Sequence, residues 1–137
     1  MTKPVPRCVN IDWLEVYVLE DSQRYPCDAD YFRRAGYFVK ERDYGTRNYS
    51  QAFCIEDKHG DPWIEVRRAP QSSDSTFTGY VKESCNLRLV NRYCYSHTAI
   101  KDFTDFLLLH GYIFKHIFRI DLCYDFTRFD SGDDPET

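Results

Sequence analysis

The chain has 137 residues, 42% of them apolar and 29% charged, and a formal net charge of −4. This length suits one compact domain, and this composition excludes an intrinsically disordered chain. No apolar run reaches the roughly 18 to 20 residues of a membrane-spanning helix, and residues 1–8 lack the apolar stretch of a secretory signal. We therefore expect a soluble cytoplasmic protein with no membrane contact.

Cysteine and aromatic residues add two expectations. The six cysteines show no CxxC or metal-knuckle spacing, which favours free thiols in a reducing compartment. Aromatic residues reach 17%, including 11 Tyr and 10 Phe. With so many tyrosines, not every ring can lie deep in the core, and some should lie on the surface. One interpretation is a small core filled with large rings, and the other is a face that packs on a partner or stacks on bases.

The first half of the chain predicts four strands and a short helix. Residues 9–18 alternate in the manner of a strand. Asp28 can cap a helix over residues 30–35, and Gly36 can end it. Turn-like segments then separate three strands, which should form an antiparallel meander. These strands are expected at 37–43, 48–56 and 63–68.

In the second half, a Ser- and Thr-rich loop at 71–78 precedes a strand predicted over 85–95. A helix is expected from about Thr98 to His110, ended by Gly111. Residues 112–126 then give the strongest strand signal in the chain. Strict alternation places Arg119 and Asp121 on one face of this strand and the apolar residues, together with His116, on the other. 

This order predicts an α+β fold. A mostly antiparallel sheet of five or six strands should carry two helices on one face, because two helices cannot cover both faces of such a sheet. The uncovered face must be polar or covered by a partner. We expect one domain over 9–127, between an N-terminal tail (1–8) and an acidic tail (128–137) that leads into a downstream region.

Basic residues concentrate in the middle of the sequence. Residues 33–92 hold 11 Lys or Arg against 8 Asp or Glu. On the predicted strands, cations beside aromatic rings suit single-stranded nucleic acid, since guanidinium groups neutralise phosphates while rings stack on bases. Ordinary pairing with Glu65, Glu41 and Asp43 is the alternative. The candidate nucleic-acid-binding residues are Lys40, Arg42, Arg67, Arg88 and Arg92.

Asp121 is a candidate metal ligand, because an ionised carboxylate inside so apolar a strand needs a compensating cation. Arg119 could supply that charge as an ion-pair partner. The other interpretation is a divalent metal, Mg²⁺ or Mn²⁺, held with carboxylates of neighbouring strands. Glu65 and Glu15 are the candidates for those further ligands.

Two short segments, Asn10 to Leu14 and Phe118 to Phe126, carry a resemblance to a known family. They resemble the replication initiation factors of plasmids and phages, whose N-terminal half has an R-x-D-x-x-x-D strand; Arg119, Asp121 and Asp125 match it here. The resemblance, over roughly residues 9–127, implies a relaxase-like fold and metal-dependent, rolling-circle nicking of one DNA strand. The family's nucleophilic tyrosine lies downstream of this strand, and a His-x-His pair is missing here.

The resemblance and the residues together predict the DNA-binding N-terminal domain of a replication-initiator-like protein. The chain alone should bind single-stranded DNA or distorted duplex without cutting it. The alternative is a non-catalytic domain that docks a protein on an aromatic sheet face.

Overall fold

A computed structural model describes residues 6–42, 48–71, 81–94 and 96–126, except the side chains of 6–10 and 123–126. This part of the chain holds six strands and three helices, and every pair of neighbouring strands is antiparallel, so the predicted α+β fold is confirmed. The elements in chain order are β1 (Pro6–Leu19), α1 (Ala29–Arg34), β2 (Phe38–Glu41), β3 (Tyr49–Glu56), β4 (Pro62–Pro70), β5 (Ser84–Leu89), α3 (Asn91–Cys94), α4 (Ala99–Leu109) and β6 (Ile113–Phe126).

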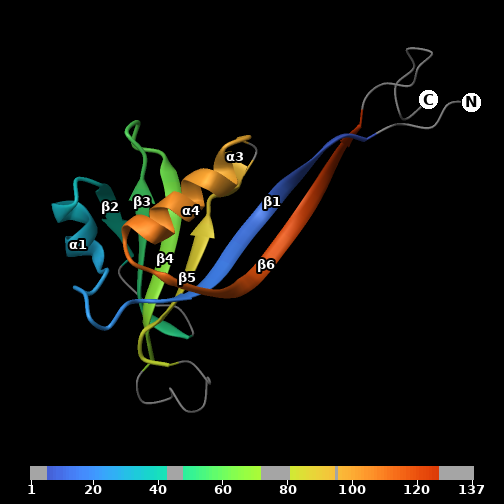
Figure 1. The fold of residues 1–137 in the computed structure, drawn as a ribbon. Helices are drawn as coiled ribbons and strands as arrows, with labels where there is room; N and C mark the ends of the chain where they lie inside the picture. The colour runs from blue at the N-terminus through green and yellow to red at the C-terminus, as the bar shows by residue number, and fades with distance from the viewer. Residues whose placement is uncertain (1–5, 43–47, 72–80, 95, 127–137) are drawn as a thin grey trace, which may run out of the picture.

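The strands lie in the order β2-β3-β4-β5-β1-β6, so the predicted meander is present and the first and last strands are neighbours. β5 pairs with β1 only from Leu14 to Leu19, whereas β6 pairs with β1 from Pro6 onward. The outer half of β1 therefore has β6 as its sheet neighbour. In Figure 1 these two strands continue past the rest of the sheet as a two-stranded ribbon.

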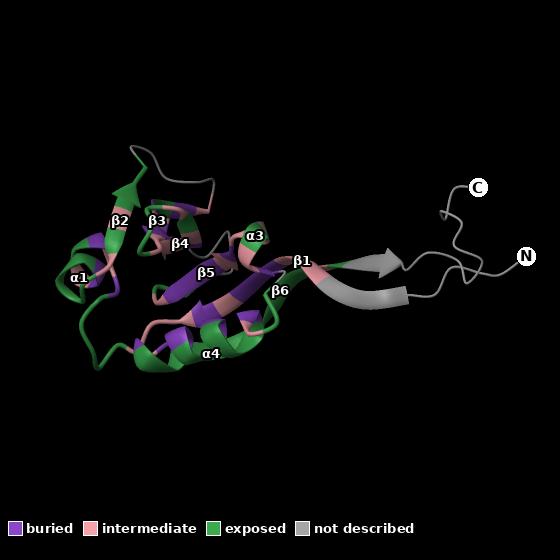
Figure 2. Cartoon of the chain, turned by 90° about the horizontal axis from the view of Figure 1, so that it is seen from above, coloured by how far each residue is buried: buried purple, intermediate pink, exposed green. Residues whose placement is uncertain are grey.

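One core lies between the sheet and the helices. The buried side chains of α1, α3 and α4 join the inward side chains of β1, β3, β4 and β5 in a single cluster, which confirms helices on one face. Figure 2 shows the outward side of α4 exposed and the strands beneath it buried. The fully buried apolar residues of this core include Phe32, Ile55, Ile64, Leu87, Val18 and Val66.

The predicted helix boundaries are also present. The Asp28 carboxylate accepts a hydrogen bond from the Tyr31 backbone N–H at 2.8 Å and so caps α1. Gly36 and Gly111 follow α1 and α4 with φ of +98° and +73°, a region that favours glycine. These two glycines end the helices as the sequence predicts.

Two strand boundaries differ from the prediction. The strand expected over 85–95 ends at Leu89, because the chain turns at Val90 and forms α3, which buries Cys94 against the core. Arg92 consequently belongs to a helix. β1 begins at Pro6, inside the segment expected to be a tail, because β6 pairs with it there.

Strict alternation along β6 was a wrong prediction. Its register with β1 shifts at four points, and at each of them one of the two strands has an extra residue. Arg119 lies opposite Glu15, and His116 lies opposite Tyr17, with their rings stacked at 5.0 Å. The extra residue between them brings His116 to the same face as Arg119 and Asp121.

Four cysteines, Cys27, Cys54, Cys85 and Cys94, are free thiols, in agreement with the sequence. Burial, and after it the nearby Glu20 carboxylate, raise the pKa of Cys27 to about 11. Burial also raises the pKa of Cys85 well above its usual range. Both thiols are therefore protonated and unreactive near neutral pH.

His110 lies at the end of α4 as a buried structural group. Its Nδ1 is 2.9 Å from the Tyr31 hydroxyl and its Nε2 is 3.0 Å from the Tyr37 hydroxyl. The rings of Phe32 and Phe106 pack against the imidazole. Burial, and then the Arg24 charge, lower the pKa of this histidine below its ordinary value.

Acid should destabilise the protein through His110. Because its pKa is lower in the folded state than in the unfolded chain, the unfolded state binds a proton more readily. The stabilising contribution is complete above the unfolded pKa of about 6.5 and is lost as pH falls through the folded pKa. The Tm of the parent should fall from about pH 7 to about pH 5, and His110→Gln should reduce this fall. An equal fall of Tm in the parent and in His110→Gln would contradict this role of His110. His59 lies in an exposed turn, so His59→Gln controls for the removal of an imidazole.

Candidate nucleic-acid interface

The face of the sheet opposite the helices carries two rows of side chains, which we call the basic strip. In each row the residues lie opposite one another across the sheet from β2 to β6, and Arg42, which directly follows β2, is placed by its backbone hydrogen bond to Ala52. The first row is Lys40, Cys54, Glu65, Arg88, Glu15 and Arg119, and the second is Arg42, Ala52, Arg67, Asn86, Tyr17 and His116. The strip thus holds five basic and two acidic side chains.

Glu65, on β4, is an acidic centre of the strip. Its carboxylate lies 3.1 Å from Arg42, 3.2 Å from Arg88 and 3.9 Å from Arg67. The pairing of strand arginines with Glu65, which was the alternative interpretation of the sequence, is therefore present. Glu41 pairs with Arg33 on α1, and Asp43 lies outside the described residues. One carboxylate cannot neutralise three guanidinium groups, so a positive excess remains.

Glu15, on β1, is buried beneath the strip. It accepts hydrogen bonds from the Trp13 indole N–H at 2.6 Å and from the Asn86 amide at 2.9 Å. The Asn86 amide oxygen in turn accepts from Arg67 at 3.2 Å, and Arg67 lies 3.9 Å from Glu15. These bonds fix the orientation of Trp13 and Arg67.

Trp13 stands between two arginines from the strands that flank β1. The guanidinium carbon of Arg88 lies 3.7 Å from the centre of the indole ring, and that of Arg119 lies 4.3 Å from it. Each contact is a cation–π interaction, stabilising by roughly 0.5–1 kcal/mol at an exposed site. The indole ring of Trp13 therefore contacts two positively charged groups. A base that approaches the strip would meet the planes of these guanidinium groups.

Asp121 lies beside the strip and pairs with Arg119 at 2.7 Å. The hydrogen bond from Arg119 lowers the pKa of this carboxyl group. The expected burial was wrong, because β6 is an outer strand and Asp121 is 41% exposed. An exposed, paired carboxylate does not need a metal to compensate its charge.

The three candidate metal ligands each lie against an arginine. Asp121 pairs with Arg119, whereas Arg67 lies 3.9 Å from both Glu15 and Glu65. Within the described ranges, no group of three or more His, Cys, Asp or Glu side chains could hold a metal ion. These residues, as placed here, do not fit a divalent metal site, and a metal bound with ligands from elsewhere stays a prediction.

Three predicted binding residues, Lys40, Arg42 and Arg92, differ in their surroundings. Arg42 follows β2 directly and is 45% exposed at the end of the strip, and Lys40 is exposed on β2. Arg92 lies away from the strip on α3, where it pairs with Asp61 at 3.2 Å. It borders a groove of about 850 Å³ whose rim includes Asp57, Asp102 and Asp105. These carboxylates disfavour a phosphate there. Arg92 is therefore not part of the basic strip, and its contact with nucleic acid stays a prediction.

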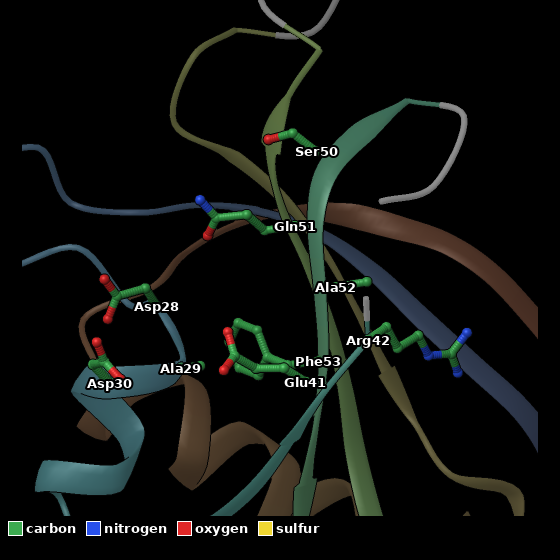
Figure 3. Close-up of a pocket in the computed structure, with 9 residues that line it drawn as sticks. All are labelled: Asp28, Ala29, Asp30, Glu41, Arg42, Ser50, Gln51, Ala52 and Phe53. Carbon is green, nitrogen blue, oxygen red and sulfur yellow. The ribbon is translucent and has the colours of Figure 1, made fainter. Parts of the chain in front are cut away.

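A second cavity, of about 290 Å³, lies between α1 and the β2–β3 edge. Figure 3 shows Asp28, Asp30 and Glu41 on one side of it and the Arg42 side chain pointing away from them. Asp28 caps α1, and Asp30 and Glu41 both pair with Arg33. These acids already have structural partners, so we assign no function to the cavity.

The sequence missed two members of the interface. The sequence indicates Arg119 as a partner of Asp121 and as part of the family motif, and Trp13 as part of the first strand and of the other motif, but it does not indicate either residue as a DNA contact. An aromatic residue flanked in space by two arginines could be found only with the strand order β5-β1-β6 known.

Comparisons of the chain with protein-family models, with curated proteins and with solved structures give no match. The resemblance to replication initiation factors therefore depends on the two sequence motifs alone. Among the described residues, no helix has the length and apolar character needed to cross a membrane.

Proposed function

We propose that the basic strip binds DNA, and that the chain is the DNA-binding N-terminal domain of a replication-initiator-like protein. The observation that best supports this proposal is the excess of positive charge on the strip. It holds five basic and two acidic side chains in a protein whose net charge is −4. Segregated positive charge on the sheet face opposite the helices favours a polyanionic ligand.

The dimensions of the strip suit a single strand. The row from Lys40 to Arg119 crosses six strands, which at about 4.8 Å per spacing gives about 24 Å. Proteins that bind single strands in such grooves cover about 4 nucleotides or more. Lys40 and Arg42 at one end and Arg119 at the other are the exposed cations that would contact phosphates.

Base stacking would use guanidinium planes as well as rings. Both neighbours of Trp13 cover its ring, but Arg119 is half exposed and can present its outer surface to a base. The stacked rings of Tyr17 and His116 lie in the adjoining row. Unpaired bases can reach such surfaces, which favours single strands or distorted duplex over regular duplex.

Strand nicking belongs to the proposal only through the family resemblance. In that family a downstream tyrosine and a divalent metal carry out the cleavage. For this chain we propose binding without cutting, with any nicking supplied by a longer protein.

Removing Lys40 and Arg42 should weaken DNA binding and its salt dependence. Each phosphate contact on a single strand contributes about 0.7 to the slope of log K against log salt, so the Lys40→Ala/Arg42→Ala protein should lose about 1.4. Fluorescence anisotropy with a labelled oligothymidylate measures both quantities. Glu65→Gln removes the acid shared by three arginines and should change binding in the opposite direction, towards higher affinity and a steeper slope.

The matched control is Arg33→Ala/Arg34→Ala, which removes two exposed cations from α1 on the helix face. It should bind as the parent does. No binding at low salt, or equal losses in the two double variants, would refute the interface and favour the protein-docking alternative.

A further inference from the structure

The last strand, β6, forms a long edge of the sheet. It has 14 residues and, within the described part of the chain, pairs on one side only, with β1, whereas the opposite edge strand β2 has 4 residues. An edge strand exposes a row of backbone N–H and C=O groups that can pair with another strand. Short edges such as β2 limit this pairing. β6 has no such limit on its length.

The side chains of β6 are also unusually apolar for an outer strand. Next to this strand, at the end of α4, Leu108 and Leu109 are 70% and 66% exposed. Neighbouring exposed apolar side chains of this kind are typical of interaction surfaces. The exposed apolar residues of β6 are Ile113, Phe114, Ile117, Phe118, Ile120 and Leu122, at 43–53%.

The charges of β6 are complementary to those of a second, antiparallel β6. If Ile120 lies opposite Ile120 of the other copy, Arg119 lies opposite Asp121. Because the pairing is symmetric, this register makes two Arg–Asp pairs at once. Arg119 and Asp121 are 50% and 41% exposed, so both can reach a neighbouring strand. Opposite charges placed directly across strands stabilise the pairing.

We infer that this chain forms a homodimer through antiparallel pairing of β6 with β6 of a second copy, about a two-fold axis at Ile120. The axis is perpendicular to the sheet, so the helices of both copies lie on the same side of a continuous sheet. The exposed apolar side chains of the two strands then meet between the two α4 helices. The self-complementary interface is the kind that two-fold symmetric dimers use.

Charge reversal tests this register. Arg119→Asp places two aspartates opposite each other at both ends of the register, and Asp121→Arg does the same with arginines. Each variant alone should have a dimer dissociation constant raised by about a hundredfold or more. An equimolar mixture restores two opposite-charge pairs and should form a heterodimer. Sedimentation or light scattering should find twice the chain mass of 16.3 kDa for the parent and the mixture.

Arg33→Asp makes the same charge change on α1 and should dimerise as the parent does. Ile120→Lys places two lysines at the axis and should give a monomer even if a charge-reversed variant fails to fold; circular dichroism monitors the fold of each protein. A monomeric parent, a variant that dimerises as the parent does, or a mixture that stays monomeric would overturn the inference. A monomeric parent would leave the edge to a different protein.

Discussion

Replacing Phe32 with alanine should lower the free energy of unfolding by about 3–5 kcal/mol, the range for large aromatic residues in cores. Phe32 is fully buried on α1. Its ring stacks on Phe106 of α4 at 5.6 Å and packs on Phe53 of β3 at 5.8 Å. The ring therefore connects two helices to the sheet, and no neighbour can fill the space it leaves without a backbone shift.

Urea denaturation of the parent and Phe32→Ala measures this loss. Phe38→Ala is the matched control, because Phe38 is 63% exposed on β2 and its truncation should change stability by about 0.5 kcal/mol or less. A loss below about 1 kcal/mol for Phe32→Ala would mean that α1 does not pack as described.

Replacing Glu20 with alanine should cost a similar amount, about 3–5 kcal/mol, because it leaves the largely buried Arg68 guanidinium without a carboxylate to neutralise its charge. The two Glu20 oxygens accept hydrogen bonds from Arg68 Nε at 3.0 Å and Nη2 at 3.1 Å. One of them also accepts from the Cys27 backbone N–H at 2.7 Å. The side chains of Glu20 and Arg68 are only 10% and 11% exposed, so water cannot replace the lost carboxylate.

Two further proteins separate this effect from the loss of any ion pair. Asp105→Ala breaks the exposed pair with Lys101 on α4 and should cost about 0.5 kcal/mol or less. Glu20→Met/Arg68→Met removes both charges and should regain much of the lost stability. If Glu20→Ala costs no more than Asp105→Ala, the pair is not desolvated as its burial indicates.

Local signals in the sequence were enough to predict most of the fold. Side-chain alternation located the strands, and Asp28, Gly36 and Gly111 located three helix boundaries. The apolar pattern of residues 112–126 predicted β6 almost to the residue, but it also indicated a buried strand. Strand order decides burial, and order depends on contacts far apart in the chain. Exposed Ile120 and Leu122 therefore have the same pattern as residues of a core strand.

The same limit applies to the interface. Alternation correctly placed Arg67, Arg88, Glu65 and Glu15 on polar strand faces, because side chains of an unbulged strand point alternately to the two faces. It misplaced His116, since an extra residue in β6 reverses the alternation and no residue type in that segment marks a bulge. Arg92 was misplaced because burial of Cys94 ended the strand before it.

Because Trp13 lies beside the basic strip, the fluorescence of the two tryptophans reports on two different parts of the molecule. The chain has two tryptophans, and the other, Trp63, packs in the partly buried shell of the core against Tyr37 and Phe106. Indole emission responds to nearby charge, and Trp13 has a guanidinium group within 4.3 Å on each flanking strand. With Trp63 replaced by phenylalanine, emission would come from the basic strip alone, and with Trp13 replaced it would come from the core. Events at the surface and melting of the interior could thus be followed in the same protein at different wavelengths or intensities, without an attached dye.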